Sequence, residues 1–280
     1  MTEWRMALPM YGVTAAARAE QDALLTRLKS HLQNVGWEGR IVSVVPEGSL
    51  YKHWLDPNLL FSQTCGYPLM TSLRDKVTLL GAPRYRCAGC FETHYSSRIV
   101  VRDSDAQASL SEYRGRIAAI NSEDSHSGMN ALRHALIPYA IASVGHAQGD
   151  AFFSDVVISG GHLRSLALLR SGEVDVAAID AVTWSLLEDS EPEHLAGLRT
   201  LQYSVSAPTL PFIGSRHLTE RQQQMIHTAL RMLLVEDGPL LEVLRITHVD
   251  AADWRAYLAV LIMEAQARNA GVASLRASIR

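Results

Sequence analysis

The fold of this chain is decided by a stretch in its middle, residues 116–139, which reads RIAAINSEDSHSGMNALRHALIPY. Its beginning is an apolar run short enough for a strand, and Met129 and Leu136 follow at helical spacing. Serines and a glycine lie between them, where the helix must begin. Ser125 or Ser127 would cap its first turn, whose backbone N–H groups carry partial positive charge. A strand, a Ser/Gly turn and a helix start together favour an oxyanion receptor, although an ordinary strand-to-helix loop has the same composition.

A second stretch repeats this arrangement in residues 156–180, VVISGGHLRSLALLRSGEVDVAAID. It predicts a strand, a Gly-rich turn, and a helix whose first turn carries His162 and which ends at Gly172. A buried strand then ends at the carboxylate of Asp180. Ligands of open α/β sheets gather outside the carboxyl ends of the strands. Two helix starts within one βαβαβ run therefore favour a phosphate-type ligand, whereas a histidine at a helix start by itself is more often a capping or packing residue.

Several segments resemble the phosphate, phosphite and phosphonate substrate-binding components of ABC importers. The similar segments are SHSGMNALR at 125–133, the stretch 159–180, VTW at 182–184, LPMY at 8–11, SQTCGYP at 62–68, and the Gly-Cys and Tyr-Ser-Ser elements at 89–97. The resemblance runs from about residue 5 to about residue 235. It implies an α/β protein with the two-lobed type II periplasmic-binding fold. In that fold two mostly parallel sheets are flanked by helices, and a ligand cleft lies between the lobes.

The resemblance also implies a function and the residues that carry it. The chain would be a solute-binding protein that captures a small phosphate-type oxyanion for transport by an ABC permease, without a cofactor. Its ligand-binding residues would be Tyr11, Tyr95, Ser125, His126, Ser127, Gly128, His162 and Asp180. His126 stands where much of the family has a small hydroxyl residue. His162 would bind the anion more tightly as its protonation increases toward about pH 6. Asp180 would either accept a hydrogen from a protonated or amine-bearing ligand or cap the helix that follows it.

Composition and charge agree with this class. The chain has 280 residues, of which 48% are hydrophobic and 20% charged, and its formal net charge is −3. Such a balance provides no basic field for nucleic acid. No apolar run is long enough to span a membrane. The start, MTEWRMAL, has no basic segment followed by an apolar core, and no cysteine. We therefore expect a periplasmic protein if a leader was removed, and a cytoplasmic one if the sequence is complete.

The order of expected elements predicts a discontinuous first lobe. Strands are expected at 5–8, 39–45, 59–62 and 76–80, and helices at 15–35 and 50–54. An extended segment at 98–102 then crosses into a second α/β lobe, and 200–211, with two prolines, forms the return crossing. Helices at 220–235, 239–244 and 251–267 complete the chain. The first lobe would comprise 1–103 plus 206–280, with lobe 104–205 inserted through two hinge strands.

Cys87 and Cys90 form a Cys-x-x-Cys pair, a pattern that occurs in metal sites and in redox motifs. Zinc would need two further ligands, and neither a second pair nor suitably spaced histidines follows. A redox motif would begin a helix, whereas the stretch at 93–101 reads as extended. We expect no bound metal, and a Cys87–Cys90 disulfide only in an oxidising compartment. Cys65 is not part of the family pattern.

An enzyme is the least favoured class. The sequence contains no Gly-x-Ser-x-Gly elbow, P-loop or Gly-x-Gly-x-x-Gly turn, so we expect no catalytic residues. The resembled fold also occurs in a pyrimidine-precursor synthase and in ligand-sensing domains. A cytoplasmic ligand-sensing or metabolic protein is therefore the alternative to a transport protein.

Overall fold

The computed structural model describes residues 2–141, 151–272 and 274–275. By its contacts the chain forms two compact units, Met1–His94 with Pro208–Tyr257, and Tyr95–Ala207 with Leu258–Arg280. The expected division, 1–103 plus 206–280 around 104–205, differs from this at both ends. The first unit ends at His94, and the last segment joins the second unit. The reason is tertiary, since this segment packs within the second unit, where Val260 O accepts a hydrogen bond from Asn130.

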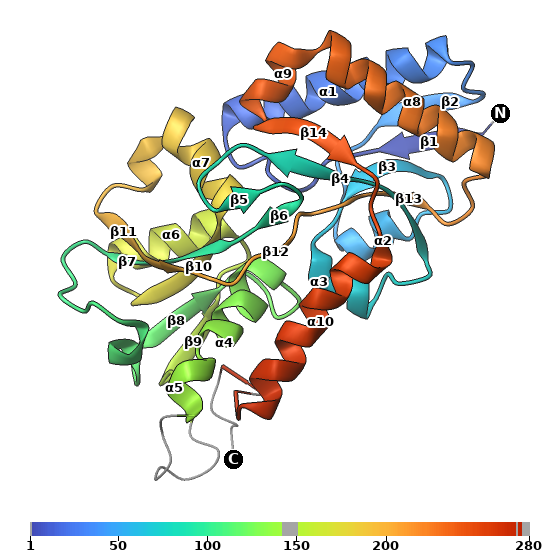
Figure 1. The fold of residues 1–280 in the computed structure, drawn as a ribbon. Helices are drawn as coiled ribbons and strands as arrows, with labels where there is room; N and C mark the ends of the chain where they lie inside the picture. The colour runs from blue at the N-terminus through green and yellow to red at the C-terminus, as the bar shows by residue number, and fades with distance from the viewer. Residues whose placement is uncertain (1, 142–150, 273, 276–280) are drawn as a thin grey trace. The chain divides into compact units, whose positions relative to one another are not determined.

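The first unit is a six-stranded sheet in the order β14-β4-β13-β3-β1-β2 (Figure 1). Its strands are β1 (Glu3–Met6), β2 (Arg40–Ser43), β3 (Leu59–Gln63), β4 (Val77–Tyr85), β13 (Phe212–Ser215) and β14 (Ile246–Asp250). Its helices are α1 (Ala15–Asn34), α2 (Leu50–Trp54), α3 (Gly66–Thr71), α8 (Glu220–Glu236) and α9 (Gly238–Val243). Helix α10 (Trp254–Asn269) begins in this unit and continues in the second.

Helix α1 shows how local signals and burial combine in this unit. Thr14 caps it, because its Oγ1 accepts the N–H of Ala17 at 3.0 Å. One face of α1 buries Leu24, Leu28 and Leu32, and the helix packs against α8 (Figure 1). The central strand β3 is buried along its whole length, as expected of a strand covered on both faces.

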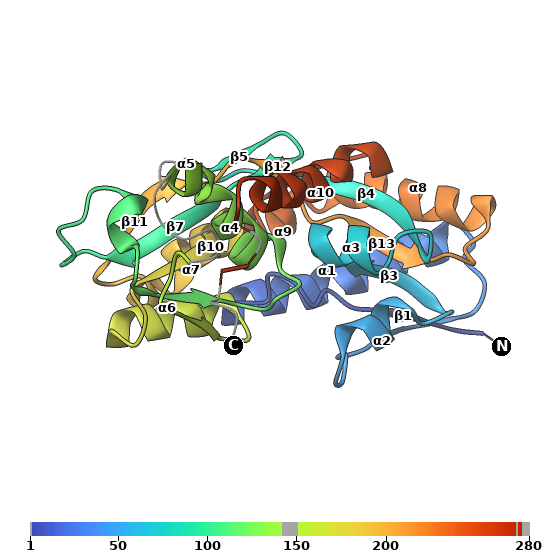
Figure 2. The same ribbon diagram turned by 90° about the horizontal axis from the view of Figure 1, so that it is seen from below.

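The second unit is a five-stranded sheet in the order β11-β7-β10-β8-β9. Its strands are β7 (Ser97–Arg102), β8 (Ile117–Ile120), β9 (Asp155–Ile158), β10 (Val176–Asp180) and β11 (Leu198–Tyr203). Its helices are α4 (Ala131–Ala135), α5 (Ile137–Ile141), α6 (His162–Ser171) and α7 (Ala181–Ser190), with 3₁₀ turns at Leu110–Tyr113 and Pro192–His194. Helices α6 and α7 pack against the fully buried strand β10 (Figure 2). Three further short strands are β5 (Cys90–Phe91), β6 (His94–Tyr95) and β12 (Ala207–Pro208).

Both large sheets are mixed, although the expected sheets were mostly parallel. The α/β class with helix-flanked sheets is confirmed, and strands joined through helices are parallel: β1 with β2 and β3, and β8 with β9 and β10. The other pairs are antiparallel. The return segment comes back as β13 between β3 and β4 and is antiparallel to both, and β7 lies between β10 and β11 and is antiparallel to both.

Two further expectations are corrected. The helix predicted to continue through 129–139 is broken into a π-helical turn at His126–Asn130, helix α4 and helix α5. The first strand lies at Glu3–Met6 instead of 5–8, and β14 had not been expected. Among the described residues, the helices are all too short or too polar to cross a membrane.

Candidate anion-binding site

The turn after β8 is a helix start lined with buried hydroxyls. Ser125 caps the π-helical turn His126–Asn130, because its Oγ accepts the N–H of Gly128 at 3.0 Å. Ser125, His126 and Ser127 are between 3% and 5% exposed. The prediction that Ser125 or Ser127 caps this turn is thus confirmed for Ser125. The Gly128 N–H, expected to bind an anion, is used by the cap.

Ser127 meets a residue from the second Gly-rich turn. His162 opens α6, and its Nε2 atom lies 2.9 Å from Ser127 Oγ. The Nδ1 atom of the same ring is buried and has no hydrogen-bond partner among the described residues. When the Ser127 hydroxyl donates to Nε2, the neutral ring carries its proton on Nδ1. When Nε2 carries the proton and donates to Ser127 Oγ, the hydroxyl hydrogen of Ser127 can point toward another acceptor. In either tautomer the pair keeps one polar hydrogen for another acceptor.

Burial makes both histidines of this region neutral. It lowers the pKa of His162 from 6.5 to about 4, because desolvation penalises the charged ring. The pKa of His126 is also lowered to about 4, by burial first and then by the positive charges of His134 and Arg133. The expectation that His162 gains a proton toward about pH 6 is therefore wrong, since desolvation dominates here. His162 acts as a neutral hydrogen-bonding group.

His126 is held by a polar network on the turn. Asn130 Nδ2 donates to His126 Nδ1 at 3.2 Å and to Val260 O at 3.0 Å, while Arg133 donates to Asn130 Oδ1 at 2.6 Å. Because Nδ1 accepts a hydrogen bond, the proton of the neutral ring is assigned to Nε2. The ring packs edge-on against Tyr95, with ring centroids 6.1 Å apart. The His126 ring is larger than the small hydroxyl residue that much of the family has at this position, and it thus fills the space between the turn and Tyr95.

Gly128 is required by a close approach. A Cβ atom on Gly128 would lie 1.8 Å from Asn121 Oδ1, far inside contact distance. Asn121 directly follows β8, and its Oδ1 atom is buried with no hydrogen-bond partner among the described residues. A buried oxygen of this kind usually accepts a hydrogen bond, and a ligand hydrogen or a water molecule would donate it. The close packing of Gly128 therefore places an unused acceptor beside the helix start.

Asp180 lies at the carboxyl end of β10 and caps α7. Its Oδ1 atom accepts the N–H groups of Val182 and Thr183 at 2.7 and 3.2 Å, and the residue is 2% exposed. Of the two roles open from sequence, the capping role is confirmed. In the β7–β10 register Asp180 pairs with Ser97. The Oγ atom of Ser97 is buried and without a hydrogen-bond partner among the described residues, although its N–H donates to Ser204 Oγ at 2.8 Å.

The two tyrosines lie in different units. Tyr95 is 2% exposed and belongs to the second unit, where it contacts His126. Tyr11 belongs to the first unit, is 8% exposed and has a positive φ of 63°. Its ring packs edge-on against Tyr85 at 5.3 Å, and Gln63 donates to the Tyr85 hydroxyl at 2.8 Å. The Gln63 amide is thereby used inside the first unit.

Within the second unit, the structure brings Ser125, His126, Ser127, Gly128 and His162 together, with Tyr95 joined through His126. Strand β10, which ends at Asp180, contacts the same turn. Sequence reasoning missed Asn121 and Asn130. The position of Asn121 at a strand end was a signal that could have found it, whereas nothing in the sequence marks Asn130 as a partner of His126.

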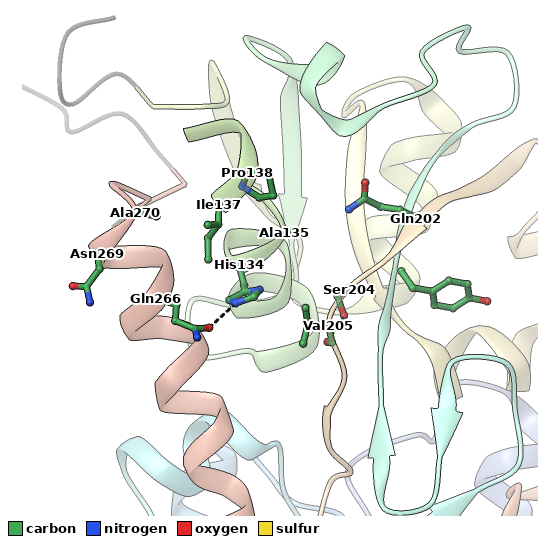
Figure 3. A pocket seen from close by; sticks show the side chains of 11 residues that line it. His134, Ala135, Ile137, Pro138, Gln202, Ser204, Val205, Gln266, Asn269 and Ala270 are labelled. Carbon is green, nitrogen blue, oxygen red and sulfur yellow. Dashed lines mark hydrogen bonds between the residues drawn. The ribbon is translucent and has the colours of Figure 1, made fainter. Parts of the chain in front are cut away.

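A separate cavity of about 740 Å³ in the second unit does not contain these residues. It is lined mainly by apolar or uncharged residues of α4, α5, α10 and the end of β11 (Figure 3). His134 in its wall is hydrogen-bonded to Gln266 at 2.9 Å. We place the candidate anion site at the Ser127–His162 contact, because hydroxyls and helix starts bind oxyanions, whereas the walls of this cavity expose more apolar than polar surface. The described residues include no group of three or more His, Cys, Asp or Glu side chains able to hold a metal ion.

The fold is that of the type II periplasmic-binding proteins, a class that includes the periplasmic aliphatic sulphonate binding protein of Escherichia coli. Residues 59–257 match the profile of a family described as ABC transporter, phosphonate, periplasmic substrate-binding protein. The chain belongs to this family, which consists of solute-binding proteins and is not a class of enzymes. The family resemblance found in the sequence is thus confirmed. No curated protein matches the sequence.

Solved structures agree with this assignment. PhnD1 from Prochlorococcus marinus in complex with methylphosphonate is 13% identical, with coverage of 95% of this chain and 98% of that one and a TM-score of 0.71. A binding protein component of an ABC phosphonate transporter from Pseudomonas aeruginosa is 14% identical, covering 96% and 87%, with a TM-score of 0.70. XAC2383 from Xanthomonas citri, bound to ATP, is 15% identical, covering 96% and 98%, with a TM-score of 0.69. Identities this low show a shared fold.

Proposed function

We propose that the protein is a periplasmic solute-binding component that captures a phosphate-type oxyanion and delivers it to an ABC permease. The ligand is phosphate, phosphite or a phosphonate. Family membership supports the general role, and the PhnD1 complex with methylphosphonate supports the ligand class. The observation that carries the proposal is the contact of Ser127 with His162, two residues that each lie at a helix start after a strand.

The contacts of the anion follow from the polar atoms left by the folded turn. One hydrogen of the Ser127–His162 pair would donate to a ligand oxygen. Tyr95 is proposed as a second contact on the strength of the family resemblance. The Ser125 hydroxyl, His126 and the backbone of Gly128 would shape the turn around the anion. Tyr11, from the first unit, is proposed as a further contact on the strength of the family resemblance. Because both histidines are neutral, hydrogen bonds and helix starts would supply the attraction instead of a full positive charge.

Asp180 would select the ligand's protonation state. A buried carboxylate repels an anion unless a hydrogen lies between them. Asp180 would therefore accept a hydrogen from monoanionic phosphite, hydrogen phosphate or an aminoalkylphosphonate. Sulfate has no such hydrogen at neutral pH. Asp180→Asn keeps an oxygen for the α7 cap, so calorimetry of this variant with phosphate and sulfate separates the two roles. A variant that rejects sulfate as strongly as the wild type leaves Asp180 as a cap only.

Calorimetry with phosphate, phosphite and methylphosphonate tests the main proposal. Replacing both Ser125 and Ser127 by Ala is expected to weaken binding by roughly 2–4 kcal/mol, from about 1–2 kcal/mol for the lost bond of Ser127 to a charged ligand and about 1–2 kcal/mol for the lost Ser125 cap that shapes the turn. Ser127→Ala alone removes the contact to His162 without touching the cap on Gly128. Ser30→Ala, on the exposed face of α1, is the matched control and should bind as the wild type does. Unchanged affinity of the double variant for all three ligands would refute the assignment.

A further inference from the structure

The Cys87–Cys90 pair lies outside the candidate anion site and carries a separate inference. Strand β4 ends at Tyr85, and the four residues from Cys87 to Cys90 form the turn that leads into β5. The Cys90 N–H donates to Cys87 O at 3.0 Å and closes this turn. Gly89 occupies its third position with a φ of 98°, a conformation that glycine adopts without strain. The two cysteines are thus brought to one side by the backbone itself.

The side chains follow the backbone. The two Sγ atoms lie 3.0 Å apart, about 1 Å beyond the length of a disulfide bond. Both cysteines are half-buried and line an open pocket of about 570 Å³ together with Phe91 and Thr247. A reagent the size of a small thiol or the active-site loop of a thiol-disulfide enzyme therefore has access to the pair.

The base of the turn is pinned to the first unit. Arg84, near the end of β4, makes two hydrogen bonds to Asp250 of β14, at 2.5 and 3.1 Å. Arg86 donates from its backbone N–H to Arg245 O at 2.8 Å and from its side chain to Glu242 at 3.0 Å. Because β4 and β14 are also paired in the sheet, folding holds the approach to Cys87 in one conformation. The two thiols are therefore positioned before any oxidation takes place.

We propose that Cys87 and Cys90 are a built thiol–disulfide exchange site, which an external disulfide of the glutathione or dithiol-oxidoreductase class oxidises reversibly. One cysteine thiolate attacks the external disulfide RSSR and releases the first RS⁻. The second thiolate then attacks the mixed disulfide, closes the Cys87–Cys90 bond and releases the second RS⁻. The protein loses two electrons and two protons, and the oxidant becomes two thiols. The pair would be closed in an oxidising compartment and open in a reducing one.

Mass spectrometry of the full chain, equilibrated in buffers of oxidised and reduced glutathione and then alkylated, tests this proposal. Trypsin cleaves after Arg86 and Arg98, so one peptide, 87–98, contains both cysteines, while Cys65 falls in another. The expected product is this peptide lacking two hydrogen atoms. It should persist in Cys65→Ser and disappear in Cys87→Ser and Cys90→Ser. A peptide crosslinked to Cys65, a stable glutathione adduct that never closes, or no oxidation would each overturn the proposal.

A comparison of folded and denatured protein shows whether the fold builds the site. The equilibrium constant for forming the Cys87–Cys90 disulfide should be at least about tenfold larger in the folded protein than in denaturant. The reason is that folding has already ordered the turn, so that forming the disulfide costs less conformational entropy. By the same cycle, the oxidised protein should melt at a higher temperature than the reduced one. Gly89→Val strains the turn at its positive φ and should reduce the folded advantage. Equal constants in the folded and denatured protein would overturn the proposal even if the disulfide forms.

Discussion

The two neutral histidines of the candidate site should make the protein sensitive to mild acid. An unfolded chain takes up a proton on each histidine as the pH falls through 6.5, whereas His126 and His162 resist protonation in the folded protein until about pH 4. Between these values the unfolded state binds more protons than the folded state. The stability that the two neutral histidines contribute is therefore fully present above about pH 6.5 and is lost as the pH falls toward about 4.

The size of this effect follows from the two pKa values. For a histidine with a pKa of 6.5 in the unfolded chain and about 4 in the folded one, lowering the pH from about 7 to about 5 costs about 2 kcal/mol of unfolding free energy. His126 and His162 together should account for about 4 kcal/mol. This is a large share of the stability of an ordinary domain.

Urea unfolding at about pH 7 and about pH 5 measures this loss of unfolding free energy. It is applied to the wild type and to the variants His126→Gln and His162→Gln. Glutamine keeps hydrogen-bonding atoms but cannot titrate. Each variant should lose about 2 kcal/mol less than the wild type on acidification, and the double variant about 4 kcal/mol less. His217→Gln, at an exposed position, is the matched control and should lose as much as the wild type. A double variant with the acid sensitivity of the wild type would refute the reasoning.

Three other outcomes are expected. Gly128→Ala places a methyl group against Asn121 Oδ1 and should lower the unfolding free energy by about 1–3 kcal/mol in urea titration; Asn121→Ala in the same chain should restore most of it, and an unchanged loss would contradict the contact. Asp180→Ala removes the cap of α7 and should cost about 1 kcal/mol of unfolding free energy, with Asp180→Asn costing less; equal losses would show that the cap does not stabilise the fold. Chelation should leave the melting temperature unchanged, whereas stoichiometric zinc that is lost together with stability would show that Cys87 and Cys90 bind metal.

The local elements of this protein could be predicted because their signals are local. Helices Ala15–Asn34 and Glu220–Glu236 begin at Thr14 and Thr219, whose side chains cap the first turn. Capping and apolar periodicity act within a few residues and are therefore visible in one sequence. The same holds for the Ser125 cap and for a helix that starts at His162.

The sequence by itself thus determined the class of the fold, the two Ser/Gly helix starts and the family to which the chain belongs. Only the tertiary structure decided the mixed strand directions, the contact of Ser127 with His162 and the close approach of Asn121 to Gly128. These depend on which distant segments come into contact, and no local propensity encodes that. The neutral state of His162 has the same origin, because a pKa reflects the water that the completed fold removes from around the ring.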